Sequence, residues 1–544
     1  MCSFASDTRA AMALARSSAL FCAALAVSAQ DAFVLSETSR ARVFAGVGGI
    51  SGGGATSRAL FDYPAPARSA LLDLLFTPQH GAALQHAKVE IPADADTTCG
   101  SEVAHRHDAR DGGSCTRGYE GEFLAAAAAR RPGIATSSLQ WAAPRFVGEP
   151  GVSNGDSLFT LTNARDYVVP WLKCMRDAYN VSLSFQGAGW NEKPHNVSYI
   201  KLLRAELDAA GLAAVGLAAA DQCCGSNWQI AADMAADPAL AAIVDVVTTH
   251  VAGALEENTP TPAAAIALGV PLSQGEEHFG LPDPDPVPIW DFAALAATGV
   301  EINQNWVVNS MTSTIFWPAA YGWLAGLLYR GKGLVVATSP WAQPPVYYVP
   351  DALFVVAHTT HFTTAGEYWL LNASAGHIGQ GKVHPVPAAP GGWNTSWVAY
   401  VPAGCSAAAP AQCELTLVVE SFLAGGDWHG AAPHALAAPA AAPATATFRL
   451  ADGLAARLAG GALHVWHTNA SVVFAREADV AVSADGSFAI SIEPGAIKTF
   501  TSVASAHPGA RAAVDALAPT GAVRVGLGAP PSSAAGPELL FPSS

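Results

Sequence analysis

The chain has 544 residues, of which 51% are hydrophobic and 13% charged, and its formal net charge is −16 at pH 7. This composition excludes an intrinsically disordered protein, because the chain can bury enough apolar surface to fold. The negative charge argues against binding nucleic acid or anionic membranes through bulk electrostatics. A chain of this length accommodates a barrel with one or two accessory modules.

Residues 1–29 have the features of a secretory signal peptide, with an ordinary buried helix as the alternative. Arg9 and Arg16 precede an apolar run at 19–26, and small residues at 27–29 offer a cleavage site. No later segment is long and apolar enough to predict a transmembrane helix. Asn-x-Ser/Thr sites, which fit a glycoprotein of the secretory route, occur at Asn180, Asn196, Asn372, Asn394 and Asn469.

Nine cysteines occur in the chain, and seven remain after the first two leave with the signal peptide. Sequence proximity predicts local disulfides that pair Cys99 with Cys115 and Cys405 with Cys413. Because seven is odd, at least one of the others should be free or paired between chains; these are Cys174, Cys223 and Cys224. No Cys/His spacing matches a zinc site, and we expect neither a metal nor a cofactor.

The region 42–338 alternates short apolar runs with helical patterns, as a (β/α)8 TIM barrel does. Helical spacing of apolar residues is clearest at 198–208, where Gly211 follows as a stop signal. The eight expected strands are Val43–Val47, Leu84–Ile91, Ile134–Leu139, Leu183–Phe185, Ala213–Leu217, Ile243–Val247, Val270–Leu272 and Thr312–Phe316. We therefore predict an α/β fold with a parallel barrel.

After the barrel the pattern changes to alternating strands separated by Gly, Pro and Ala, which predicts an antiparallel β-sandwich over 339–505. Residues 30–41, with the apolar run Ala32–Leu35, are expected to add a strand to it. The other expected strands are Leu353–Ala357, Leu415–Glu420, Ala446–Leu450, His464–His467 and Phe488–Ile492. Residues 506–544 are rich in Ala, Pro, Gly and Ser and are expected to form a low-complexity tail.

Two acidic motifs follow strands of the predicted barrel, whose active sites lie at the C-terminal strand ends. Glu192 follows the fourth strand, and Glu276 and Glu277 follow the seventh. Retaining sugar hydrolysis requires one carboxyl as acid/base and a second as nucleophile. Asn191 is placed to contact a sugar 2-hydroxyl. The plainer alternatives are a helix start with Asn191 as cap, and solvated loop charges at 276–277.

Aromatic residues at other strand ends would provide the flat apolar surface that a sugar ring requires. Trp141 follows the third strand and Trp317 ends the eighth, although a place in the core is the commoner fate of a tryptophan. His250 ends the sixth strand, where a structural hydrogen bond is equally well supported. The glycine-rich run Gly48–Arg58 lacks the Gly-Lys-Ser/Thr ending of a phosphate loop, which favours a close backbone approach or a tight turn.

Several segments together resemble glycoside hydrolase family 59, the galactocerebrosidase family. They extend in collinear order over roughly 43–500 and are Gly48–Arg58, His86–Ile91 with Thr97 and Thr98, Gly189–Glu192, Tyr199–Arg204, Asn303–Asn305, Met311–Ile315 with Trp317, and Ala357–Thr363. The resemblance implies a retaining β-galactosidase that releases galactose from galactosylceramide and related galactolipids. It also implies a lysosome-like compartment and a saposin-like protein that presents the lipid.

The resemblance assigns roles to individual residues. It makes Glu192 the acid/base and Glu276 the nucleophile. The positions that match galactose contacts of the family are Thr98, Trp141, Asn191 and Trp317, and Tyr329 keeps the spacing of a residue that supports the nucleophile. The family motif Leu-Trp-Ser-Ser-Glu-Asp is altered here to the segment Leu272–Glu277. Alignment on Leu272 selects Glu276, whereas alignment on Phe279 selects Glu277; the first keeps the acid pair intact.

Two departures from the family leave alternatives open. No arginine occurs between Arg330 and Arg449, where the family has a galactose-contacting arginine, and the C-terminal lectin-like domain of the family is not recognised in this chain. The alternatives are a retaining glycosidase that acts on another galactoside or glycolipid, and a non-catalytic carbohydrate-binding relative.

Overall fold

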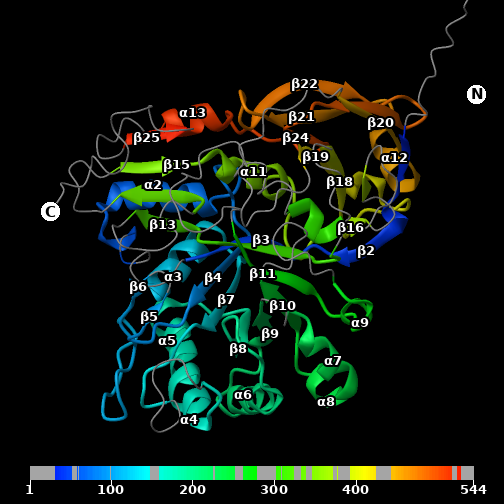
Figure 1. Cartoon of the computed structure of the whole chain (residues 1–544). Helices are drawn as coiled ribbons and strands as arrows, with labels where there is room; N and C mark the ends of the chain where they lie inside the picture. The colour runs from blue at the N-terminus through cyan, green and yellow to red at the C-terminus, as the bar shows by residue number, and fades with distance from the viewer. Residues whose placement is uncertain are drawn as a thin grey trace, which may run out of the picture. The chain divides into compact units, whose positions relative to one another are not determined.

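The structure is a computed structural model (Figure 1), and it describes residues 31–51, 58, 60–97, 100–147, 158–223, 227–250, 261–278, 302–307, 309–323, 333–338, 346–371, 376–377, 393–423, 443–516 and 524–527. The predicted signal peptide therefore lies outside the described residues. Within the described part, no helix is long and apolar enough to cross a membrane.

The centre of the fold is a closed parallel barrel of eight strands in the order β10-β11-β12-β3-β4-β7-β8-β9. Their bounds are β3 Gly46–Ile50, β4 His86–Glu90, β7 Ala135–Gln140, β8 Phe185–Trp190, β9 Gly216–Gln222, β10 Val246–His250, β11 Leu272–His278 and β12 Ser313–Trp317. Each strand pairs with its neighbours in parallel register. The fold class predicted from the alternating pattern is thus confirmed.

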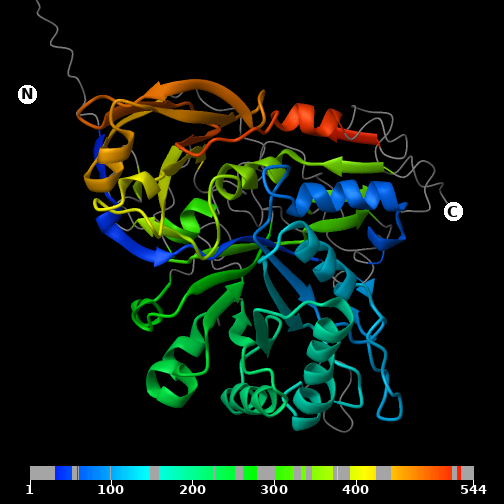
Figure 2. The same ribbon diagram turned by 180° about the vertical axis from the view of Figure 1, so that it is seen from behind.

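Helices connect the barrel strands and are seen around the barrel in Figures 1 and 2. The longer helices bury one apolar face, as α6 does with Tyr199, Ile200, Leu203 and Leu207, and this produces the 3.6-residue period in the sequence. They are α2 Ala65–Phe76, α3 Glu120–Arg130, α4 Leu161–Asn163, η2 Ala164–Val168, α5 Val169–Tyr179, α6 Val197–Ala209, α7 Gln229–Ala236, α8 Pro238–Ala241 and α9 Ala263–Ala267. A two-stranded ribbon of β5 Asp96–Thr97 and β6 Gly100–Ser101 follows β4.

Several barrel strands begin later than the sequence predicts. The fifth is expected at 213–217 and lies at Gly216–Gln222, and the seventh is expected at 270–272 and lies at Leu272–His278. Short apolar runs show that a strand exists but mark its ends poorly, because polar residues near the mouth of a barrel continue the strand without an apolar signal. Asp221 and Glu276 consequently lie within strands.

Glycines at β3 have the packing role expected of a close backbone approach. A Cβ atom at Gly48 would lie 2.6 Å from the carbonyl oxygen of His86 on β4. A side chain larger than hydrogen would therefore push two paired strands apart. The rest of the glycine-rich run, residues 52–57, lies outside the described residues.

Two further sheets form the second part of the fold: the larger is antiparallel, and the smaller is mixed because β1 pairs with β20 in parallel while β20 pairs with β23 antiparallel. The larger has the order β2-β16-β18-β19-β24-β21-β22, with β17 beside β18, and the smaller has the order β1-β20-β23. Their bounds are β1 Asp31–Leu35, β2 Arg40–Val43, β16 Tyr368–Leu371, β17 Gly376–His377, β18 Trp393–Pro402, β19 Thr416–Leu423, β20 Ala444–Leu450, β21 Ala462–Thr468, β22 Ala475–Ala481, β23 Ser487–Ile492 and β24 Ala496–Thr501. The short helices η1 Glu37–Ser39, η4 Pro410–Gln412 and α12 Asp452–Leu458 connect them.

Apolar side chains of the two sheets share a core that includes Trp397, Phe448 and Phe500. The opposite face of the larger sheet, with Tyr400, Val418 and Trp466, belongs instead to the core of the barrel. The sheets and the barrel are therefore joined by buried apolar contacts as well as by the chain.

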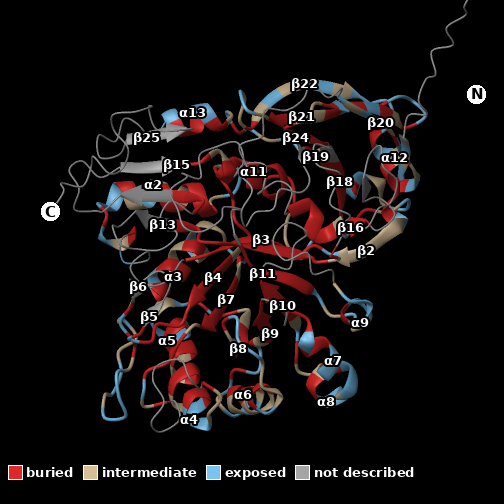
Figure 3. Cartoon of the chain, in the orientation of Figure 1, coloured by how far each residue is buried: buried red, intermediate tan, exposed pale blue. Residues whose placement is uncertain are grey.

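The segment expected as a strand at Leu353–Ala357 is a helix, α11 Asp351–Thr360. Residues 352–360 are all buried, as the red colouring of α11 in Figure 3 shows. His358 contacts Thr499 and Thr468 of the sheet at 2.9 and 2.8 Å. A helix buried on every side has no polar face, so its sequence cannot be distinguished from that of a buried strand by periodicity.

A four-stranded sheet, β13-β14-β15-β25, was not expected. It consists of β13 Ala320–Trp323, β14 Val335–Thr338, β15 Val346–Val349 and β25 Arg524–Leu527, and β25 pairs with β15 in parallel. Together with α13 Ala510–Asp515, it places ordered elements in the segment expected to be a low-complexity tail. Figure 2 shows α13 and β25 beside β15. Pairing with a distant strand leaves no local signal in an Ala/Gly-rich segment.

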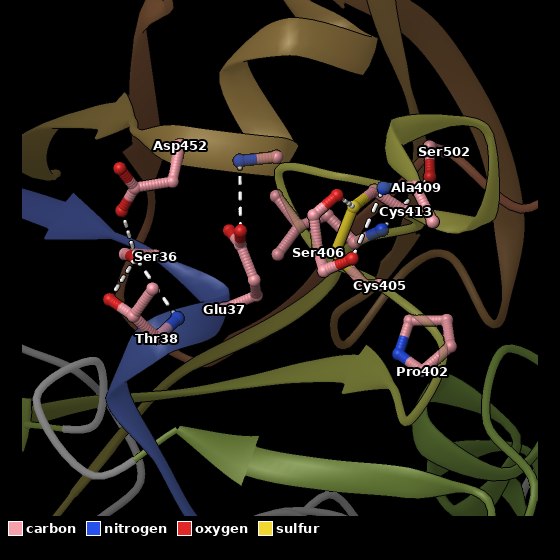
Figure 4. Close-up of a disulfide and its surroundings, with 12 residues drawn as sticks. Ser36, Glu37, Thr38, Pro402, Cys405, Ser406, Ala409, Cys413, Asp452 and Ser502 are labelled. Atoms are coloured by element: carbon pink, nitrogen blue, oxygen red, sulfur yellow. Dashed lines mark hydrogen bonds between the residues drawn. A yellow bond between two sulfur atoms is a disulfide. The ribbon is translucent and has the colours of Figure 1, made fainter.

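One predicted disulfide is confirmed and another is wrong. Cys405 pairs with Cys413, and Figure 4 shows this bridge beside Ser406 and Ala409. Cys115 pairs with Cys174, 59 residues away on α5, and not with Cys99. Cys223 is also disulfide-bonded, so neither Cys174 nor Cys223 is free. Packing of the loop before α3 against α5 decides the pairing, and chain proximity does not show that packing.

Candidate active site

The C-terminal ends of four neighbouring barrel strands bring acidic and basic side chains together. Glu192 follows β8 in a short turn, and Asp221, His250 and Glu276 lie on β9, β10 and β11. These ends meet at one mouth, where barrels of this type bind substrates. The strand order makes β8, β9, β10 and β11 consecutive neighbours around the barrel.

Glu192 lies in a tight turn and not at the start of a helix. Its φ is 59°, in the left-handed region, and its backbone N–H donates to the carbonyl oxygen of Asp221 at 2.9 Å. The following helix α6 begins at Val197 and is capped by Asn196, which accepts from the Tyr199 N–H. The alternative in which Asn191 caps a helix is therefore excluded. The side chain of Glu192 is 39% exposed, so it faces the open mouth.

Glu276 is buried, with its side chain 5% exposed. Strand β11 has an irregularity between Gln274 and Glu277, which changes which residues face the mouth. Glu276 is in register with His250 on one side, and Glu277 with Phe316 on the other. The Glu277 carboxylate accepts from Gln274 Nε2 at 2.5 Å. The backbone of β11 therefore turns Glu276 toward Glu192 and gives Glu277 a different partner.

His250 lies between the two glutamates. Its Nδ1 is 3.7 Å from Glu192 Oε1 and 3.5 Å from Glu276 Oε2, and the imidazole is completely buried. One carboxylate oxygen of each glutamate and a ring nitrogen of His250 all lie within 4.8 Å of one another. The sequence left His250 undecided between a site residue and a structural residue, and its position is in the centre of the cluster.

The charges around His250 determine its protonation. Burial by itself lowers the pKa of the imidazole, but the effect of the nearby carboxylates, Glu276 first, is larger and raises the pKa to about 9. For Asp221 burial acts in the opposite direction and raises the pKa, but the positive charges of Lys88 and His250 outweigh burial and hold that pKa below its ordinary value. His250 is therefore a buried cation among carboxylates at neutral and acidic pH.

Three His, Asp or Glu ligand atoms this close together could in principle hold a metal ion. Among the described residues, the group Glu192, His250 and Glu276 has this spacing. Without a bound ion, the raised pKa of His250 favours the imidazolium, in which both ring nitrogens carry protons. Within the described residues, the three side chains form a cluster in which His250 contacts both glutamates.

Lys88 and Asp221 were not predicted as site residues. Lys88 Nζ lies 2.8 Å from Asp221 Oδ1, and both side chains are buried. Lys88 was visible in the sequence only as a charged residue within an apolar strand, and Asp221 only as an acid after a run of alanines. A buried charge at the end of a barrel strand is the signal that could have identified them.

The predicted aromatic residues lie together at the same mouth. Trp141 directly follows β7 and is half-buried, and it packs against the cluster of Ile50, Ile315 and Trp317. Trp317 is 4% exposed, so most of its ring is covered. The Trp141 carbonyl accepts from Trp190 Nε1 at 2.8 Å, which holds the turn after β7 against β8. Trp141 thus presents more free surface than Trp317.

Asn191 is 7% exposed, and its Oδ1 has no hydrogen-bond partner within the part of the chain that the structure describes. Its backbone N–H donates to the carbonyl of Gln140 at 3.0 Å, which fixes it beside Glu192. A buried acceptor of this kind is costly unless a ligand hydroxyl satisfies it. The predicted contacts Thr98 and Tyr329 lie outside the described residues.

With this geometry in place, comparison with known proteins identifies the family. A sequence profile of glycosyl hydrolase family 59 matches residues 44–361. The chain belongs to glycosyl hydrolase family 59. The match includes the whole barrel and α11, so the candidate site residues described above lie within it.

Two relatives illustrate the similarity of this family 59 chain to characterised members. Galactocerebrosidase of Danio rerio is 36% identical over 346 residues, which is 64% of this chain and 49% of the relative. Galactocerebrosidase of Homo sapiens is 36% identical over 368 residues, or 66% of this chain and 49% of the relative. The chain thus spans about half the length of the curated relatives it matches.

Solved structures support the fold of this family 59 chain. SrfJ from Salmonella typhimurium superimposes with a TM-score of 0.60 at 12% identity, covering 87% of this chain and 92% of SrfJ. The catalytic domain of GH30 xylanase C from Talaromyces cellulolyticus gives 0.57 at 15% identity, covering 87% and 99%. At these identities the similarity concerns the barrel and its accompanying sheets alone.

Proposed function

We propose that this family 59 chain is a retaining β-galactosidase that hydrolyses galactosylceramide and related galactolipids to galactose and ceramide. The observation that carries the proposal is the separation of Glu192 and Glu276, whose nearest carboxylate oxygens lie within 4.8 Å. Retaining enzymes hold their carboxyls ~5–5.5 Å apart, whereas inverting enzymes leave ~6.5–9.5 Å for a water molecule. Family membership and the similarity to galactocerebrosidases support the galactolipid substrate.

In the first step, the Glu276 carboxylate attacks the anomeric carbon while the Glu192 carboxylic acid gives its proton to the glycosidic oxygen. The bond from the anomeric carbon to that oxygen breaks, ceramide leaves as an alcohol, and galactose is bound to Glu276 as an ester. In the second step, the Glu192 carboxylate takes a proton from water, whose oxygen attacks the same carbon. Galactose is released with its configuration retained, and both glutamates return to their starting states.

The surroundings suit the two carboxyls to these different roles. Glu192 is 39% exposed at the mouth, where the leaving group and then the water can reach it. Glu276 is buried, and its Oε2 lies 3.5 Å from His250 Nδ1, away from the opening that the leaving group would use. Asn191 would donate or accept at the sugar 2-hydroxyl, a contact that strengthens in the transition state. Trp141 and Trp317 would contact the apolar face of the ring, with Thr98 and Tyr329 as further contacts.

The decisive experiment measures the stereochemistry and the covalent intermediate. With an aryl β-galactoside between about pH 4 and 7, we expect β-galactose as the first product by NMR. A 2-deoxy-2-fluorogalactosyl fluoride should label Glu276, identified by peptide mass mapping, while label on Glu277 would show that the other acid is the nucleophile. Release of α-galactose first would refute retention, and no hydrolysis by folded protein would favour the carbohydrate-binding alternative.

Variants of the two glutamates test their separate roles. Glu192→Ala should lower kcat by about 10²–10⁴-fold for substrates with a poor leaving group. Azide should restore turnover of an activated aryl galactoside by this variant and yield the β-galactosyl azide. With Glu276→Ala, azide attacks the opposite face and should yield the α-galactosyl azide. Exchanged products would reverse the two assignments.

The natural substrate and setting form the second part of the proposal. The test measures the rate of hydrolysis of galactosylceramide in vesicles, with and without a saposin-like lipid-binding protein, and compares it with the rate for a soluble galactoside. We propose residence in the secretory pathway, either in a lysosome-like compartment or outside the cell, which the disulfide-bonded cysteines support. Hydrolysis of soluble galactosides but not of the vesicle-bound lipid would favour a different galactoside as substrate.

A further inference from the structure

A buried ion pair links two strands of the barrel that are not neighbours, next to the two glutamates. Lys88 on β4 and Asp221 on β9 meet at 2.8 Å, and their side chains are 5% and 2% exposed. Strands β7 and β8 lie between β4 and β9 in the barrel order, so Lys88 reaches a strand that is not its neighbour. Because burying two charges costs about as much as their attraction returns, stability alone explains such a pair poorly. Its other contacts show what it does.

Asp221 holds the acid/base side of the site. Its carbonyl oxygen accepts from the Glu192 N–H at 2.9 Å, and its carboxylate accepts from His250 Nε2 at 3.0 Å. Glu192 and Asp221 both have left-handed backbone conformations, with φ of 59° and 52°. Side chains other than glycine adopt this region rarely and keep it only where the surroundings enforce it. Asp221 therefore fixes the backbone of Glu192 and the ring orientation of His250.

Lys88 holds the nucleophile side. Its Nζ also donates to the carbonyl oxygen of Gly275 at 2.9 Å, the residue before Glu276 in the irregular part of β11. A Cβ atom at Gly275 would lie 2.4 Å from Asp221 Oδ1, so glycine is needed for β11 to approach the pair. The same ammonium lies 5.9 Å from the centre of the Trp141 ring.

We propose that Lys88 and Asp221 are positioning residues that set the separation of Glu192 and Glu276. Asp221 accepts a hydrogen bond from the backbone of Glu192, and Lys88 donates one to the backbone beside Glu276. The ion pair between Lys88 and Asp221 links these two contacts. This inference rests on the proposed function, because the separation matters for double displacement. Neither residue needs to touch the substrate to perform this role.

The test compares Lys88→Met and Asp221→Asn with a matched control, Lys201→Met. Lys201 forms an ion pair with Asp237 at 2.5 Å, but those side chains are 40% and 32% exposed and lie on α6 and before α8. With an aryl β-galactoside, we expect each site variant to lower kcat by about 10²-fold, as small misplacements of reacting groups do. KM should stay within about threefold of the wild-type value, because the contacts that bind the substrate and the transition state equally are unchanged. The control should match the wild type.

The pH profile of kcat/KM separates positioning from simple support of the fold. Removal of the Lys88 cation should raise the pKa values of the nearby carboxyls and shift the profile to higher pH. Removal of the Asp221 anion should shift it to lower pH. If the pair only supports the fold, both variants would lower stability while the folded protein keeps the wild-type kcat and pH profile, and that result would overturn the proposal.

A second variant and a structural measurement cover the remaining outcomes. If Lys88→Met does not fold, Gly275→Ala should displace the Asp221 carboxylate and lower kcat similarly; full activity in it would contradict the proposal. An inactive wild-type protein refutes hydrolysis, and crystal structures of the variants then decide positioning by themselves. We expect the His250 ring and the Gly275 carbonyl to turn in Lys88→Met, and unchanged positions of both glutamates would reject the inference.

Discussion

Loss of the disulfide between Cys115 and Cys174 should destabilise the protein more than loss of the one between Cys405 and Cys413. The two bridges enclose segments of 59 and 8 residues. Closing a longer loop in the unfolded chain removes more conformational entropy, which gives about 4 kcal/mol for the first and about 2.5 kcal/mol for the second. Double alanine variants make the comparison direct, because both bridges are replaced by the same small side chain.

Urea unfolding followed by circular dichroism and tryptophan fluorescence would measure the two free energies. Reduced wild-type protein would lose both bridges together with the disulfide of Cys223, so its loss of stability sets an upper limit for the two losses combined. The first bridge also attaches the loop before α3 to α5, so thermolysin should cut the Cys115→Ala/Cys174→Ala variant faster near residues 100–119. A larger loss of stability in the Cys405→Ala/Cys413→Ala variant would show that native contacts around Ser406 outweigh chain entropy, and the loop argument would be wrong.

Three further predictions concern the site. The His250 pKa of about 9 implies that its carboxylate contacts stabilise the fold fully below about pH 6.5, and that this stabilisation is lost as the pH rises through 9. The free energy of unfolding of the wild type, relative to that of His250→Gln, should therefore fall by about 3 kcal/mol between these limits. A difference that grows with pH would disprove this prediction. Because the Glu277 carboxylate accepts a hydrogen bond from Gln274, Glu277→Gln should lose about 1–3 kcal/mol of stability but keep kcat within about threefold of the wild type. Glu276→Gln, measured beside it, should lose turnover. Loss of turnover in both variants would contradict the separation of roles. Trp141→Ala should raise KM about tenfold with little change in kcat, and Trp141→Phe should bring KM most of the way back to the wild-type value. An unchanged KM in the alanine variant would exclude Trp141 from the sugar site.

The alternation of strands and helices along the chain was sufficient to predict the barrel, because each amphipathic helix and each buried strand carries its own period. The position of Glu192 at the mouth follows from the same reading, since parallel strands place their C-terminal ends together. The Cys405–Cys413 bridge was predictable because the two cysteines are only 8 residues apart, so closing the loop costs little conformational entropy. These features depend on local sequence.

Tertiary structure alone decided the features that depend on contacts between distant segments. One irregularity in β11 determines that Glu276, and not its neighbour, faces His250, because a shift of one residue exchanges the faces of a strand. The burial of α11 on all sides hid its helical period, and packing against α5 chose the partner of Cys115. The pairing of Lys88 with Asp221 joins residues 133 positions apart, and only closure of the barrel brings their charges together.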